Sequence, residues 1–321
     1  MEDSFHESQL LDKKTLTPLM RRTSTRSIIH FSIQYILLIV SVAMIIWRYG
    51  KAPWQWLLPA FVFALMVIPM FAVGHETTHR TAFRARWLNE LVLWLSSLPI
   101  FYVPSLFRHF HFAHHRYTHD PLRDPEISIG GKPAPGATSS LFMYISFLSG
   151  LPLMLFKIGM MVAASIGHGK WIWDGFLNYV PERARRRVRW EARVAMVFHI
   201  AVLYIAIYHV PALWIVYIAN AFGHLLLTLL LVSEHNGLPH SKSITESTRT
   251  TLTNPLILFL MWNMPYHTEH HAYPAIPWHA LPQLHTLMQP ELKHLNEKGY
   301  PHFHSRVTQT LLKGQPYTES P

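Results

Sequence analysis

The chain has 321 residues, of which 50% are hydrophobic and only 14% are charged, and its net charge at pH 7 is +10. Soluble domains carry about 25% charged residues, and the apolar residues here form runs long enough to cross a bilayer, so we expect an integral membrane protein. The basic residues flank these runs, which favours a role in membrane topology over nucleic-acid binding. The absence of cysteine excludes disulfides, thiolate metal sites and cysteine nucleophiles.

Four apolar segments are predicted to cross the membrane. The first two, residues 28–47 and 54–74, follow a polar N-terminus over residues 1–27. At 1.5 Å per residue, about twenty helical residues cover a hydrocarbon core of about 30 Å. The other two, residues 192–209 and 212–232, form a hairpin broken at Pro211. Arg21, Arg22 and Arg26 precede the first span, so the positive-inside rule puts the N-terminus in the cytoplasm.

Two further apolar stretches, residues 87–106 and 141–164, are expected to lie on the membrane surface or to dip in and return. If the first stretch crossed, the histidines before and after it would lie on opposite sides of the membrane. The second leads into an arginine run that belongs on the cytoplasmic side. The predicted fold is therefore all-α: four transmembrane helices with interfacial helices and a cytoplasmic histidine-rich cap over residues 28–289, then a polar cytoplasmic tail over residues 290–321.

Three histidine clusters lie beside apolar runs. They are His75 and His79, then His111, His114 and His115, and finally His267, His270 and His271. Helical residues three or four apart share a face, whereas adjacent rings diverge, so His114 and His115 can approach two different metal ions. Imidazole suits iron, copper and zinc. Eight such donors are too many for one ion, and they favour a pair of redox metals over zinc, which normally takes four ligands.

The clusters, with the run from Asp124 to Glu126 and the run from Asn263 to His271, resemble the membrane fatty acid desaturase superfamily, whose pattern is HxxxH, HxxHH and HxxHH around four spans. The resemblance implies two Fe²⁺ ions, O₂ as co-substrate, and one further histidine at the cytoplasmic end of the fourth span. His235 matches that position. His224, with Asn220 four residues earlier, is the competitor. We favour His235 because it lies nearer the third cluster and at the predicted membrane edge.

Four carboxylates are predicted to orient the ligating imidazoles. Glu76, Glu234 and Glu269 each adjoin a predicted ligand, and Asp124 follows the second cluster. Carboxylates commonly accept the second N–H of a metal-bound imidazole.

The resemblance implies an O₂-dependent oxidoreductase that acts on C–H bonds of a lipid acyl chain, first of all a fatty acid desaturase. A lipid or carotenoid hydroxylase or ketolase would use the same ligands. A histidine-lined membrane metal carrier is the alternative from another class, and it would place ionisable groups at mid-span. The spacing fixes neither the substrate nor the position of reaction.

Electrons must come from a separate carrier of the ferredoxin or cytochrome b5 type, because no fused haem domain and no cysteine-ligated iron–sulfur motif is present. The arginines of residues 183–193 suit anionic lipid headgroups at least as well as an acidic carrier. The compact chain favours a bacterial inner membrane over the endoplasmic reticulum.

Overall fold

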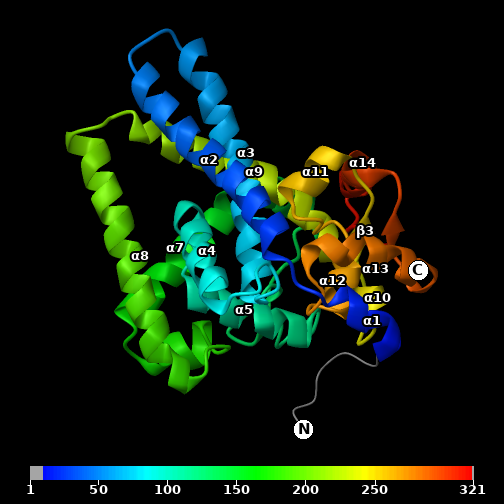
Figure 1. Cartoon of the computed structure of the whole chain (residues 1–321). Helices are drawn as coiled ribbons and strands as arrows, with labels where there is room; N and C mark the ends of the chain where they lie inside the picture. Colours follow the sequence, from blue (N-terminus) through cyan, green and yellow to red (C-terminus); the bar gives the residue numbers. More distant parts are fainter. Residues whose placement is uncertain (1–9, 320–321) are drawn as a thin grey trace.

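A computed structural model describes residues 10–319 and shows a mostly helical chain (Figure 1). Within residues 10–319, four helices are long and apolar enough to cross a membrane: α2 (Ser24–Arg48), α3 (Trp54–Thr78), α8 (Glu182–Tyr208) and α9 (Leu213–His235). The four predicted spans correspond to these four helices. Helix α8 begins ten residues earlier than the predicted span, because the arginine-rich segment before residue 192 is also helical and starts directly after Pro181. Arginine is a good helix former, and proline is tolerated at a helix start.

Helix α3 is the centre of the bundle and packs against both α2 and α9. The contact between α3 and α9 depends on Gly223. A Cβ atom at that position would lie 2.4 Å from Cγ2 of Val67 and 2.6 Å from the carbonyl oxygen of Ala64. Large side chains on α8, such as Val197 and Ile200, instead point outward and are exposed, as expected of a lipid-facing helix.

We expect Gly223→Ala to lower the free energy of unfolding by about 1–3 kcal/mol, because the added methyl group overpacks the contact between α3 and α9. Thermal unfolding of the purified protein in detergent measures this effect. The matched control is Gly159→Ala on α7 (Leu151–Ile166), where a Cβ atom would meet nothing within 4 Å. Alanine has the better helix propensity, so this control should be neutral or slightly stabilising, and equal losses in both variants would contradict the close-contact explanation.

Two further apolar helix pairs are sharply bent. Helix α4 (Arg86–Ser97), the 3₁₀ turn η1 (Leu98–Ile100) and α5 (Pro104–Tyr117) make a bend of 95°, and α6 (Leu141–Leu148) and α7 (Leu151–Ile166) make one of 66°. The second bend lies at Gly150, which has a φ of +74° and a backbone so close to α9 that a Cβ atom would lie 2.3 Å from the nitrogen of Leu225. Only glycine fits such a position without strain.

Both bent pairs return to the end of the bundle where they start. The first pair begins at Arg86, shortly after His79, and its second helix carries His111, whose Nε2 atom lies 2.7 Å from that of His79. The second pair leads into α8, where Arg187 reaches Glu90 of α4 at 3.4 Å. The prediction that these stretches dip in and return agrees with this arrangement.

Short elements form a cap beside one end of the bundle (Figure 1). They are α10 (Ile244–Ser247), β3 (Thr250–Thr251), α11 (Pro255–Leu260), α12 (His267–Ala272), η3 (Trp278–Ala280), α13 (Leu281–Met288), η4 (Gln289–Glu291), β4 (Leu295–Asn296) and α14 (Gly299–Leu312). Strand β3 pairs in parallel with β4. Elsewhere, β1 (Ser128–Ile129) pairs with β2 (Lys132–Pro133) in an antiparallel hairpin, and η2 (Trp171–Phe176) is a π-helical turn.

The two polar ends of the chain pack onto this cap. Helix α1 (Lys13–Leu19) buries Leu16 and Leu19 in one apolar cluster with residues of α13. Helix α14 turns Phe303 and Val307 into an apolar cluster with Val232 of α9. Residues 1–9 of the predicted N-terminal segment lie outside the described residues, and the division of the chain at residues 27 and 289 stays a prediction.

Candidate metal centre

The nine histidines predicted from the sequence converge at one end of the bundle. They come from the end of α3, from α5, from the end of α9 and from α12, and they form two groups in which the candidate ligand atoms all lie within 4.8 Å of one another. The first histidine group comprises His75, His79, His111, His115 and His270, and the second comprises His114, His235, His267 and His271.

Adjacent histidines divide between the groups. The rings of His114 and His115 have centroids 5.8 Å apart and planes at 75°, and those of His270 and His271 are 5.8 Å apart at 90°. One turn of α5 and one turn of α12 thus each supply both groups. This is the divergence that the sequence spacing predicted for neighbouring residues on a helix.

Outer hydrogen bonds fix the ring orientations in the second group. The Nδ1 atom of His235 lies 2.9 Å from the carbonyl oxygen of Ser247, which can only accept, so this nitrogen donates. The hydroxyl of Thr118 donates to the carbonyl of His114 at 2.8 Å and therefore accepts from Nδ1 of His271 at 3.2 Å. The Nδ1 atom of His114 donates to Asp124 at 3.0 Å. In the neutral rings each Nε2 atom then carries a lone pair.

These lone pairs face one another across short gaps. The Nε2 atoms of His114 and His271 are 3.3 Å apart, and those of His235 and His267 are 2.8 Å apart. In the first group, the Nε2 atoms of His115 and His270 are 3.2 Å apart. The Nδ1 atoms of His75, His115 and His270 are also buried without a hydrogen-bond partner among the described residues. Nε2 atoms that face one another at these distances fit cations held between the rings.

The environment keeps most of these rings neutral, which is the form that binds metal. Burial, reinforced by the charge of Arg108, lowers the pKa of His79 to about 3. Burial and the neighbouring imidazoles also hold the pKa values of His111 and His271 well below the usual range. His114 differs. Burial lowers its pKa, but the charges of Asp124 and Glu126 outweigh burial and raise it to about 9.

The four predicted orienting carboxylates have different surroundings. Asp124 accepts from His114, and an oxygen of Glu234 lies 3.6 Å from Nδ1 of His267. Glu76 instead accepts the backbone N–H of Trp278 at 3.1 Å. Glu269 accepts from His285 and from Thr250, each at 2.5 Å. The structure therefore brings Asp124 and Glu234 to imidazoles of the second group and turns Glu76 and Glu269 toward other partners.

His224, the competitor of His235, lies outside both groups. Its Nδ1 atom donates to the carbonyl of Asn220 at 2.9 Å, so its Nε2 atom accepts from the Lys157 ammonium at 3.2 Å. Eleven residues of helix, about 16 Å, separate it from His235. The geometry agrees with the preference for His235, although ligation itself stays a prediction.

Comparisons with known proteins agree with this geometry. Residues 17–305 match the family Fatty acid desaturase. The chain belongs to the fatty acid desaturase family. Among its relatives, the "sn-1 oleoyl-lipid 12-desaturase" of Picosynechococcus sp. is 37% identical over 90 residues, 27% of this chain and 26% of the relative. The protein of the same name from Anabaena variabilis is 30% identical over 119 residues, 34% of each chain.

A third relative of this desaturase-family chain is matched over a longer stretch. The "Sphingolipid delta(4)-desaturase" of Komagataella phaffii is 24% identical over 243 residues, 70% of this chain and 60% of the relative. The match spans about a quarter to a third of the two 12-desaturases.

Sequence reasoning missed two groups that orient imidazoles in this desaturase-family site. Thr118 lies four residues after His114 on the second histidine cluster, and this spacing could have identified it. Ser247, the last residue of α10, contributes only its carbonyl oxygen to His235, and a backbone group gives no signal in the sequence. His119 also approaches this region, since its ring centroid lies 5.7 Å from that of His235, and His240 donates to the carbonyl of His119 at 2.9 Å.

The end of α9 is fixed by a buried arginine. The Arg249 guanidinium, 1% exposed, bonds the carbonyl oxygens of Ser233 and Asn236 and the carboxylate of Glu319. A cation here satisfies carbonyls that a helix end leaves without partners. Because His235 lies between these carbonyls, Arg249 holds the backbone of a second-group histidine.

We expect Glu319→Gln to lower the free energy of unfolding by about 3 kcal/mol, because it leaves the buried Arg249 charge without its carboxylate partner. The change is measured as the shift of thermal unfolding in detergent. Arg306→Gln is the matched control, since it removes a second cation from the same carboxylate at 2.9 Å but is 45% exposed, so about 0–1 kcal/mol is expected. Equal shifts in the two variants would contradict the role of the buried pair.

Proposed function

We propose that this member of the desaturase family binds two iron ions, one in each histidine group, and removes hydrogen from C–H bonds of a lipid acyl chain with O₂ as co-substrate. The observation that carries the proposal is the convergence of nine imidazoles into two groups of facing, mostly buried donors. When bound, an iron pair supplies the reduction of dioxygen to an oxidant able to attack an unactivated C–H bond. The protein supplies position and the exclusion of water.

The residues of each group have defined duties in this proposal. The first group would hold one ion through His75, His79, His111, His115 and His270. The second would hold the other through His114, His235, His267 and His271. Asp124, Ser247 and Thr118 keep three of the second-group rings turned with Nε2 inward, and Glu234 faces His267. Such partners fix the tautomer and make the ring a better donor.

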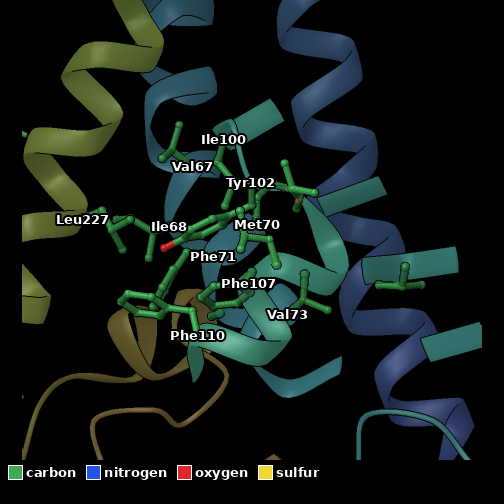
Figure 2. Close-up of a cluster of buried hydrophobic side chains, with 14 of the residues drawn as sticks. Val67, Ile68, Met70, Phe71, Val73, Ile100, Tyr102, Phe107, Phe110 and Leu227 are labelled. Carbon is green, nitrogen blue, oxygen red and sulfur yellow. The ribbon is translucent and has the colours of Figure 1, made fainter. Parts of the chain in front are cut away.

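Apolar side chains cover the membrane side of the centre and would exclude water. Figure 2 shows Phe71, Tyr102 and Phe107 packed together within the helix bundle. The ring of Phe71 lies 6.0 Å from that of His75, and the ring of Phe107 lies 5.8 Å from that of His111. An acyl chain suits such surroundings, since it has no polar groups to satisfy.

We infer that the substrate is an acyl chain of a membrane lipid and that the product carries a new double bond. The names of the three relatives, all lipid desaturases, support this choice. The clustering of the histidines at helix ends argues against a metal carrier, which would line the middle of the spans. A separate electron carrier would supply the electrons on the cytoplasmic side, and a bacterial inner membrane is the proposed location.

Expression in a host of defined lipid composition, followed by mass spectrometry of the lipids, tests the proposal. A loss of two hydrogens from a lipid means desaturation, and a gain of one oxygen means hydroxylation. His267→Ala should abolish either product. Metal analysis of protein from iron-replete cells should give about two irons per chain. Stoichiometric zinc together with no oxygen-dependent product would contradict the proposal.

A further inference from the structure

The candidate metal centre comes close to the surface at Phe112. This residue follows His111 on α5, its ring centroid lies 5.6 Å from that of His79, and it is 44% exposed. Of the nine imidazoles, only His79 and His115 are partly rather than fully buried. Both belong to the first histidine group, so an exposed aromatic ring lies against the more accessible of the two groups.

Arginines gather beside this ring around one carboxylate. Arg80, Arg108 and Arg187 lie 3.1, 3.0 and 3.4 Å from oxygens of Glu90. They come from the turn after His79, from α5 and from the early part of α8, the stretch that precedes the predicted span. A second carboxylate, that of Glu191, forms an ion pair with Arg187 at 2.7 Å. Three guanidinium groups thus share two carboxylates, which leaves an excess of positive charge.

More positive charge lies along the outer face of α5. Arg183 lies one turn before Arg187 on α8, and its side chain is exposed. Arg116, one turn after Phe112 on the same helix, is also exposed.

We propose that Phe112, with Arg80, Arg116, Arg183 and Arg187 around it and the buried charge of Arg108 behind them, forms the docking face for an acidic one-electron carrier protein, and that electrons enter the centre through the contact between Phe112 and His79. We call this surface the Phe112 face. The inference rests on the proposed function. In each encounter a reduced carrier loses one electron and one ferric ion becomes ferrous, so two encounters reduce the pair, and no covalent bond changes.

The arrangement suits a protein partner better than lipid headgroups. Glu90 holds three of the arginines in fixed positions, and preorganised charge favours a complementary protein surface. Oppositely charged patches also accelerate encounter, by about tenfold to a thousandfold at low salt. A lipid headgroup would use the charges but would gain nothing from an exposed ring in contact with a metal-site imidazole.

The test uses metal-loaded, full-length protein in nanodiscs of neutral lipid, without oxygen. The probes are two acidic carriers, a reduced plant-type ferredoxin and the soluble domain of cytochrome b5. Carrier binding and stopped-flow oxidation of the carrier are both measured, and reduction of the iron by a small uncharged reductant is followed in parallel. The proposal requires that at least one carrier reduces the wild-type protein.

Arg183→Glu combined with Arg116→Glu should slow carrier association at least about tenfold at low salt, and the difference should shrink at high salt. The control is Lys51→Glu, which reverses the charge of an exposed residue in the loop between α2 and α3, at the opposite end of these helices from the histidines. It should leave association unchanged. Phe112→Leu should leave binding almost intact but slow electron transfer at least about tenfold. Phe142→Leu, at a 78% exposed position on α6, is its control.

Three outcomes would overturn the docking proposal. The first is no reduction of the wild-type protein by either carrier, and the second is equal slowing by the two phenylalanine variants. The third is unchanged carrier kinetics in the charge variants, which would leave these arginines to lipid headgroups. The small reductant needs no docking face, so it distinguishes failure of the docking proposal from failure of the proposed function. If oxygen is then admitted to protein reduced by that reductant and a lipid product forms, the function stands whatever the carriers do.

Discussion

His235→Gln is expected to abolish lipid product and to lower the bound metal from about two ions to about one per chain. The second histidine group has four members, and an amide is a much weaker ligand than imidazole for a redox metal. The same substitution at His224 should leave the metal content and the product unchanged. There the glutamine can still accept a hydrogen bond from the Lys157 ammonium, which lies 3.2 Å from Nε2 of the histidine.

The pair of variants is compared by metal analysis and by lipid mass spectrometry on protein from the same host. Thermal unfolding in detergent provides the check on folding, because His224 is fully buried and any loss there should be of stability only. If His224→Gln lost an ion while His235→Gln kept both, the assignment of the ninth ligand would be reversed. If neither variant changed metal content, the second group would not be a metal site.

The convergence of the histidines could be predicted because it depends on local geometry. Residues three or four apart on a helix share a face, and every cluster adjoins an apolar run, so an even number of crossings between clusters places them together. The separation of His114 from His115 follows from the same rule. The two returning stretches rest on this parity argument, whereas the four spans rest on the length of their apolar runs, and the structure agrees with both.

The choice of orienting carboxylates shows the limit of that reasoning. Glu76 and Glu269 adjoin predicted ligands in the sequence, but neighbouring helical side chains point about 100° apart. Each therefore meets a residue from another element: Trp278 for Glu76, and His285 and Thr250 for Glu269. Asp124, ten residues after His114, reaches that ring because the chain turns back. Such contacts depend on tertiary structure, which spacing does not encode.

The helical start of α8 was missed for a related reason. A run of arginines signals a membrane boundary, and the prediction began the span only where the apolar residues begin. The helix in fact starts at Glu182, and Arg187 thereby reaches Glu90 on α4. A membrane boundary in the sequence is not a helix boundary, because polar turns can extend a transmembrane helix into water.

Asp124→Asn is expected to weaken metal binding in the second group by about 10- to 100-fold and to lower product formation in proportion. Asp124 is fully buried, and its two oxygens accept from Nδ1 of His114 at 3.0 Å and from the backbone N–H groups of His119 at 2.7 Å and Glu126 at 2.9 Å. An asparagine keeps the shape, but its NH₂ group cannot accept, so one of these donors loses its partner. The ring of His114 also loses the charge that makes it a stronger donor.

Metal retained against a competing chelator, followed over time, measures this effect, and the lipid product measures its consequence. Glu126→Gln is the matched control, because its carboxylate lies farther from His114, at 3.7 Å, and is 40% exposed, so solvent screens its charge. A loss below about threefold is expected there. If the two variants lost metal equally, net negative charge near the site would be responsible rather than the hydrogen bond. If Asp124→Asn kept both ions, the carboxylate would only shape the loop after α5, and the orientation of His114 would have to come from its packing against His271 and His235.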